Sequence, residues 1–123
     1  MPGIRRFEEL TCWKEARALS RAIDLWLATS TISDQSYIDQ LRRASVSVQL
    51  NIAEGFDRFT HNDFHRFLRI AKASLSEVRA LLIIGFDRGF PDAATHASLA
   101  DQAELLAKRL ARLMSYLRTS KPR

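Results

Sequence analysis

Residues 40–58 read QLRRASVSVQLNIAEGFDR, and the two apolar faces of this stretch decide the fold. At 100° per residue, an α-helix gathers one set of apolar and small side chains on a single face: Ile38, Leu41, Ser45, Val48 and Ile52. A second set lies on roughly the opposite face, which a small monomeric protein normally leaves polar: Val46, Leu50 and Ala53. We therefore expect the first face to pack in a helical bundle and the second to contact another copy of the chain.

A polar ribbon runs along the same helix, through Gln40, Ser47, Asn51, Glu54 and Arg58. Glu54 precedes Arg58 by four residues, the favourable order for an ion pair on a helix. Glu54 could act as a general base or bind a metal together with Asn51, but this helix carries no His, no Cys and no nucleophile–base pair. We interpret Ser47, Asn51, Glu54 and Arg58 as a structural polar network that ties the helix to a neighbour, and we predict no catalytic residue.

Outward from this stretch, the apolar periodicity predicts four helices, at residues 9–29, 34–56, 60–86 and 92–118. Short polar connections separate them, with Ser33 or Asp34 and Thr60 as candidate N-caps. Four long helices with short connections predict one all-α domain over residues 1–123, an antiparallel up-down-up-down four-helix bundle. The expected core of the other three helices is Cys12, Ala16, Leu19, Ile23, Trp26 and Leu27, then Phe64, Phe67, Leu68, Ala71, Leu75, Val78 and Leu82, and then Leu99, Ala103, Leu106, Leu110, Leu113 and Leu117.

The composition argues against a membrane or secreted protein. The longest apolar run, residues 80–86, is far shorter than the ~20 residues that cross a bilayer, and the N-terminus has no apolar segment of a secretory signal. Cys12 is the only cysteine, so an internal disulfide is impossible. The sequence contains no glycine-rich phosphate loop and no dinucleotide fingerprint. We expect a cytoplasmic protein that uses no cofactor.

The net charge is +5, and the positive excess lies mainly in residues 58–79 and 92–123, which include much of the third predicted helix and the C-terminal segment. One side of the third helix gathers His65, Arg69, Lys72, Ser76 and Arg79, and the fourth carries Lys108, Arg109 and Arg112. Long basic side chains at this spacing can follow a phosphate backbone, and an oligomer would repeat them and multiply their field. We therefore take these basic residues as the candidate nucleic-acid-binding set. The alternative is a solvated helix face without a ligand.

The histidines and tryptophans have simpler explanations than a metal site or a base-stacking platform. His61 and His65 have the i, i+4 spacing of metal ligands on a helix, but we expect both to be exposed at a helix start, with only Asp57 or Asp63 as a third ligand, and we predict no metal. Trp13 and Trp26 are expected as core or interface anchors. No aromatic residue interleaves with the basic residues of the third helix, which argues against a dedicated reader of single strands.

Residues along nearly the whole chain carry a resemblance to a known family: Phe7, Leu10, Trp13, Ala16, residues 40–44 and 47–48, the Asn-Ile-Ala-Glu-Gly run at 51–55, and Phe64, Phe67, Leu68, Ile70, Ala71, Ser74 and Glu77. They are similar to the four-helix bundle protein family, which includes proteins encoded by intervening sequences inside bacterial 23S ribosomal RNA genes. The run at 51–55 resembles the signature of that family. The chain departs from it at Ala73, where the family often has Gly.

The resemblance implies a bundle that assembles as a ring-like homopentamer, in a family whose molecular function is poorly defined. A more distant relative, the accessory variability protein of diversity-generating retroelements, binds nucleic acid and a reverse transcriptase, so both become expected partners here. We predict a non-catalytic, homo-oligomeric interaction module that binds structured RNA or DNA through repeated basic faces. The alternative is a protein–protein adaptor or scaffold with no nucleic-acid role.

Overall fold

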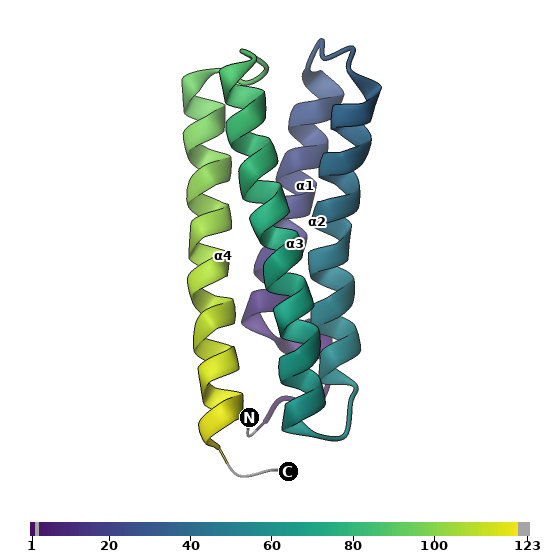
Figure 1. Ribbon diagram of the computed structural model, residues 1–123, viewed down its shortest axis with the longest axis vertical. Helices are drawn as coiled ribbons and strands as arrows, with labels where there is room; N and C mark the ends of the chain where they lie inside the picture. The colour runs from purple at the N-terminus through teal and green to yellow at the C-terminus, as the bar shows by residue number, and fades with distance from the viewer. Residues whose placement is uncertain (2, 121–123) are drawn as a thin grey trace.

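The computed structural model describes residue 1 and residues 3–120, and all of their regular structure is helical (Figure 1). A short 3-10 helix, η1 (Phe7–Glu9), comes first. Four long α-helices follow, α1 (Thr11–Thr29), α2 (Gln35–Phe56), α3 (His61–Asp87) and α4 (Ala93–Thr119). The predicted all-α class and the four helices are confirmed.

Capping side chains set the start of three of the four helices. Asp34, Thr60 and Asp92 precede α2, α3 and α4, and each side-chain oxygen accepts a hydrogen bond from the backbone N–H three residues later, at 2.7–3.1 Å. We expected the first helix to begin at residue 9, but α1 begins at Thr11. The reason is Leu10, which has an extended backbone and buries its side chain in the core, so the helical path is broken after η1.

Consecutive helices lie side by side, and α4 packs against α1 to close the bundle (Figure 1). Early residues of α2 lie opposite late residues of α3. Tyr37 Oη donates a hydrogen bond to the Leu81 carbonyl oxygen at 2.7 Å, and further along the hydroxyls of Ser47 and Ser74 are 2.8 Å apart. The N-terminus and the end of α4 meet at the same end of the molecule as the α2–α3 connection (Figure 1), where the Met1 amino group donates a hydrogen bond to Tyr116 Oη at 2.8 Å.

Two glycines allow α2 and α3 to approach closely. A Cβ on Gly55 would lie 2.8 Å from the Cβ of Phe67 and 2.9 Å from a ring carbon of Phe64. A Cβ on Gly85 would overlap the Tyr37 hydroxyl. Non-bonded side-chain atoms do not approach each other so closely, so the packing of α2 against α3 requires glycine at these two positions.

The core follows the predicted stripes, with local differences. Ile38, Phe67 and Leu113 were expected in the core but are only partly buried. The Cβ of Phe67 lies against Gly55, and two arginines, Arg58 and Arg66, cover its ring. Near the end of α4, Met114 is buried in place of Leu113. These residues follow the buried Leu110 by four and three positions, and both spacings fall on the same helix face. The structure buries the residue at the i+4 position.

One expectation about α3 is wrong. We expected both histidines at an exposed helix start, but His65 is partly buried and only 7% of the surface of His61 is exposed. The end of α4 covers it, so that His61 Nδ1 lies 3.1 Å from Ser120 Oγ and the imidazole packs near the Tyr116 ring. The two tryptophans are partly buried against the core.

Candidate nucleic-acid interface

The polar ribbon of α2 divides into two parts. Ser47 contacts Ser74 of α3, and Asn51 Nδ2 donates to the Ser47 carbonyl oxygen at 2.9 Å and to its hydroxyl at 3.2 Å. One turn further, Glu54 and Arg58 form an ion pair of 2.6 Å near the surface. The ribbon therefore contributes hydrogen bonds within α2 and one direct hydroxyl contact to α3.

A pair of arginines covers the ring of Phe67 beside this ribbon. The guanidinium carbons of Arg58 and Arg66 lie 4.6 and 4.5 Å from the ring centroid. Such cation–π contacts hold the arginine planes against the protein surface. Arg58, with its Glu54 pair, is thus engaged in the α2–α3 seam.

The basic side of α3 lies next to α4, and we call its residues the α3 stripe: His65, Arg69, Lys72, Ser76 and Arg79. Arg69, Lys72 and Arg79 are exposed, and none of them forms an ion pair with any residue that the structure describes. At ~1.5 Å of rise per residue, Arg69 and Arg79 are about 15 Å apart along the axis. Within the α3 stripe, Arg69, Lys72 and Arg79 are therefore an extended row of cations that face solvent.

His65 sits where the α3 stripe meets the end of α4. Burial, followed by the nearby guanidinium groups of Arg118 and Arg69, lowers the pKa of His65 from its ordinary value of 6.5. Its Nε2 is buried and has no hydrogen-bond partner among the described residues. Arg118 thus adds a further cation to this end of the stripe. Arg118 was not among the candidate residues predicted from the sequence, although it lies in the last turn of α4.

The basic residues of α4 are placed differently, and we call Lys108, Arg109 and Arg112 the α4 patch. Arg109 Nε forms a half-buried ion pair with Glu15 of α1 at 2.5 Å. Lys108 Nζ lies 3.7 Å from Glu104, one turn away on α4. Only Arg112 of these three is exposed without an ion pair among the described residues. Most of the positive charge of the α4 patch is therefore compensated.

Charge is also divided between the two ends of the bundle. The end with the N-terminus and the end of α4 (residues 1–20, 46–74 and 106–120) carries twelve Lys and Arg and six Asp and Glu. The other end (residues 21–45 and 75–105) carries five and eight. The positive potential is consequently higher at the first end, where Arg69, Lys72 and Arg118 lie.

A second exposed basic row lies on α1, which sequence reasoning passed over. Lys14, Arg17 and Arg21 line a shallow surface hollow on the outside of α1. Their three- and four-residue spacing is the signal that could have found them. This row is charge-matched to the α3 stripe and points away from the core.

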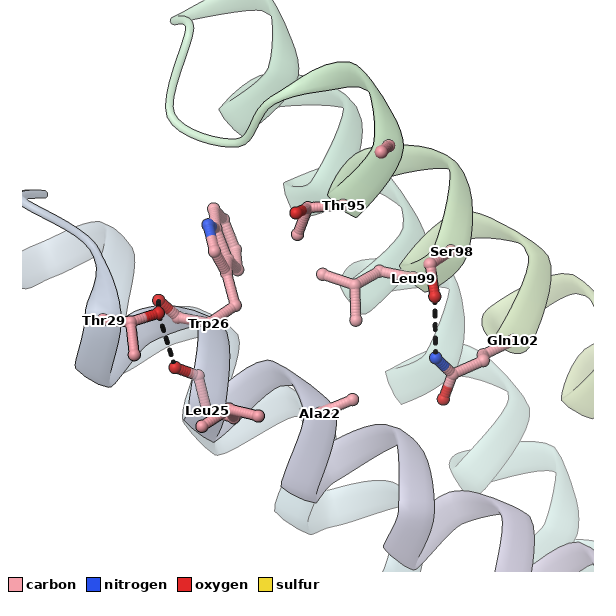
Figure 2. Close-up of a pocket in the computed structure, with 9 residues that line it drawn as sticks. Ala22, Leu25, Trp26, Thr29, Thr95, Ser98, Leu99 and Gln102 are labelled. Atoms are coloured by element: carbon pink, nitrogen blue, oxygen red, sulfur yellow. Dashed lines mark hydrogen bonds between the residues drawn. The ribbon is translucent and has the colours of Figure 1, made fainter.

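The outward face of α2 is apolar as expected, with Leu50 63% and Val46 45% exposed and Ala53 partly buried. A groove of about 410 Å³ opens between α1 and α4, and Figure 2 shows Trp26 and Leu25 on its α1 wall, opposite Thr95 and Leu99 of α4. Two separate surfaces of the chain therefore present apolar side chains to solvent.

Among the described residues, no group of three His, Cys, Asp or Glu side chains could hold a metal ion. Cys12 is buried, and burial raises the pKa of its thiol to about 12, so it is not a nucleophile near neutral pH. Within the described part of the chain, no helix combines the length and apolar character that a membrane span requires.

The model of the 23S rRNA-intervening sequence protein family matches residues 8–112. None of the curated proteins matches the chain. One solved structure, a protein of unknown function from the S23 ribosomal protein family of Bacteroides thetaiotaomicron, is 18% identical with a TM-score of 0.75, over 85% of this chain and 98% of that one. At that identity the likeness supports the fold alone. The family match covers most of the sequence, and the chain belongs to the 23S rRNA-intervening sequence protein family.

Proposed function

We propose that this chain is a non-catalytic, homo-oligomeric interaction module, an antiparallel bundle that assembles as a ring-like pentamer and binds structured RNA or DNA through repeated α3 stripes. The observation that carries the proposal is the state of Arg69, Lys72 and Arg79. They are exposed, in a row, and without ion pairs among the described residues, and Arg118 from α4 adds a further cation beside them. The basic row of α1 is also exposed, but it lies on one helix alone. Unpaired cations in a row are what phosphate contacts need, and such contacts give affinity with little sequence specificity.

The assembly is supported by two apolar surfaces that differ from one another. The outward face of α2 presents Val46 and Leu50, whereas the α1–α4 groove presents Leu25 and Trp26. Contacts between unlike surfaces are heterologous, and a heterologous contact that closes on itself produces a ring. Each added copy repeats one α3 stripe, so the ring multiplies the attraction for a polyanion.

The assembly is tested by light scattering on the purified chain. We expect a multimer well above the 14.0 kDa of one chain. Leu50→Glu should reduce its mass while the helicity measured by circular dichroism stays unchanged, because the exposed Leu50 supports the interface and not the core. Ala97→Glu, at an exposed position of α4, is the control and should leave the mass unchanged. A monomeric wild type would refute the assembly.

Nucleic-acid binding is tested by fluorescence anisotropy with a folded RNA hairpin and a DNA duplex at low ionic strength. The double variant Arg69→Glu/Lys72→Glu should abolish measurable binding, because it replaces two phosphate contacts by repulsion in every subunit. The control Arg17→Glu/Arg21→Glu makes the same charge change on α1 and should retain most of the affinity. Equal losses in both variants, or no binding by the wild type, would contradict the proposal.

A further inference from the structure

A small hollow between α3 and α4 continues the line of the α3 stripe. It has a volume of about 110 Å³ and is lined by Arg79, Leu82, Ile83, His96, Ala100 and Glu104. Pockets that hold metabolite-sized ligands are larger, about 300–1,000 Å³. A hollow of this size suits one flat ring system whose remainder stays outside.

The walls of the hollow suit a planar heterocycle. Leu82, Ile83 and Ala100 give it an apolar lining, and Ile83 is 57% exposed. On one side stands the His96 imidazole, which is stacked on Phe86 with ring centroids 4.2 Å apart and an interplanar angle of 15°. Bases of unpaired nucleotides stack on such rings and on guanidinium planes, which here means His96 and Arg79.

The polar groups of the hollow are held apart, so they remain available. Arg79 and Glu104 both line it, but they form no ion pair with each other. The contact between Glu104 and Lys108 is long, at 3.7 Å, and solvent-exposed, so the carboxylate can still accept hydrogen bonds from a ligand. His96 Nδ1 is buried without a hydrogen-bond partner among the described residues. A carboxylate accepts hydrogen bonds only, so it favours a ligand edge that presents N–H donors.

Glu104 also decides which part of a nucleotide enters. A phosphate is repelled by this carboxylate, whereas it is attracted by Arg69 and Lys72 further along α3. A neutral base with N–H groups prefers the Glu104 carboxylate, which accepts its hydrogen bonds, to the cations Arg69 and Lys72. Guanine presents N1–H and the N2 amino group side by side, which match the two oxygens of one carboxylate.

We propose that the hollow receives one unpaired nucleobase, guanine above the others, from an RNA whose phosphates follow the α3 stripe. This inference rests on the proposed function and adds the base-reading site to it. No aromatic residue of α3 interleaves with the α3 stripe, but α4 supplies an aromatic ring beside it, the imidazole of His96. Arg79 joins the two functions, since it belongs to the stripe and also lines the hollow.

The test uses hairpin RNAs with one stem and a single bulged nucleotide, either guanosine, inosine, adenosine, cytidine or uridine, and a hairpin without a bulge. Affinities are measured by fluorescence anisotropy at one salt concentration. We expect the guanosine bulge to bind about tenfold more tightly than the unbulged stem, and inosine, which lacks the N2 amino group, to fall between them. Equal affinity for bulged and unbulged stems would overturn the base site and leave the proposed function standing. Absence of binding to every RNA would overturn both.

Glu104→Gln and Ala100→Leu identify the hollow as the site. Both should remove the preference for the guanosine bulge, the first through its hydrogen bonds and the second by filling the space, while binding of the unbulged stem persists. Glu77→Gln removes the same charge from an exposed position of α3 outside the hollow and should keep the preference. If Glu104→Gln and Glu77→Gln behave alike, the assignment is wrong.

A measurement on the isolated nucleotide separates base from phosphate. The imidazole proton signals of His96 should shift on titration with guanosine monophosphate, because a stacked purine ring shields them. Ribose 5-phosphate carries the same charged group without a base and should leave them unchanged. Equal shifts with both compounds would mean that the region binds phosphate, which contradicts the proposal.

Discussion

The α3 stripe and the α4 patch carry similar numbers of basic residues, but their surroundings differ. Arg69, Lys72 and Arg79 of α3 face solvent without ion pairs among the described residues. In the α4 patch, Arg109 is bound by Glu15 from another helix and Lys108 by Glu104 from its own. A carboxylate beside a cation cancels part of the attraction of that cation for a phosphate, so similar composition gives unequal attraction for nucleic acid.

The largest expected effect separates these two regions directly. Arg69→Glu/Lys72→Glu should weaken binding to a folded RNA at least about tenfold more than Lys108→Glu/Arg112→Glu, because only the first pair consists entirely of uncompensated cations. Fluorescence anisotropy at low salt measures both. The two variants carry the same net charge, so an effect of net charge alone predicts equal losses of RNA affinity. Equal losses would contradict the difference between the α3 stripe and the α4 patch.

The next effect concerns stability. Arg109→Ala should lower the free energy of unfolding by about 1 kcal/mol, because it removes the half-buried pair with Glu15 and the packing of the arginine stem. For a chain of this size the melting temperature falls by about 4 °C. RNA affinity should stay within about twofold. Arg17→Ala, exposed on α1, should change neither quantity. A large loss of RNA affinity in Arg109→Ala would place the α4 patch in the interface.

Freeing Arg109 without removing it gives a smaller change in the opposite direction. Glu15→Gln leaves the guanidinium without its carboxylate, and we expect RNA affinity to rise by about threefold. Asp101→Asn changes the net charge equally at an exposed position of α4 and should raise affinity less. If Glu15→Gln leaves RNA affinity unchanged, the ion pair between Glu15 and Arg109 does not limit RNA binding by the α4 patch.

The smallest effect is a pH dependence that His65 gives to the α3 stripe. The pKa of His65 is lowered from 6.5 in the fold, so the unfolded chain binds more protons and stability falls as the pH drops through and below that value. Bound phosphates favour the protonated ring, so RNA affinity should rise over the same range. Affinity and thermal melting between pH 5.5 and 7.5 measure both trends. His65→Gln should flatten both, and a variant that keeps them would assign the dependence to another group.

Much of the fold could be predicted from the sequence because helical periodicity is a local property. The stripes of α2 and α3 and the caps Asp34 and Thr60 follow from the spacing of residues near each other in the chain. Where apolar residues occupy both the i+3 and the i+4 position, as Leu113 and Met114 do, the local spacing does not determine which of them is buried. The burial of His61 depends on Ser120 and Tyr116, which are far away in sequence.

The candidate site was harder to predict for the same reason. The basic residues of α3 were visible as a row, but their availability depends on which acids lie across the bundle. Nothing local to α4 shows that Arg109 meets Glu15, or that Arg118 approaches His65. The hollow combines Arg79 with His96 and Glu104 from another helix, so no single helix contains its pattern.

The salt dependence of RNA binding tests the central claim most directly. Affinity of the wild type for a folded hairpin is measured across a salt series and plotted on logarithmic axes. We predict a steep linear decrease, with the slope reduced by about one for each phosphate-binding cation that is removed from the α3 stripe and unchanged by Lys108→Ala in the α4 patch. Binding that is absent at low salt, or insensitive to salt, would contradict the account.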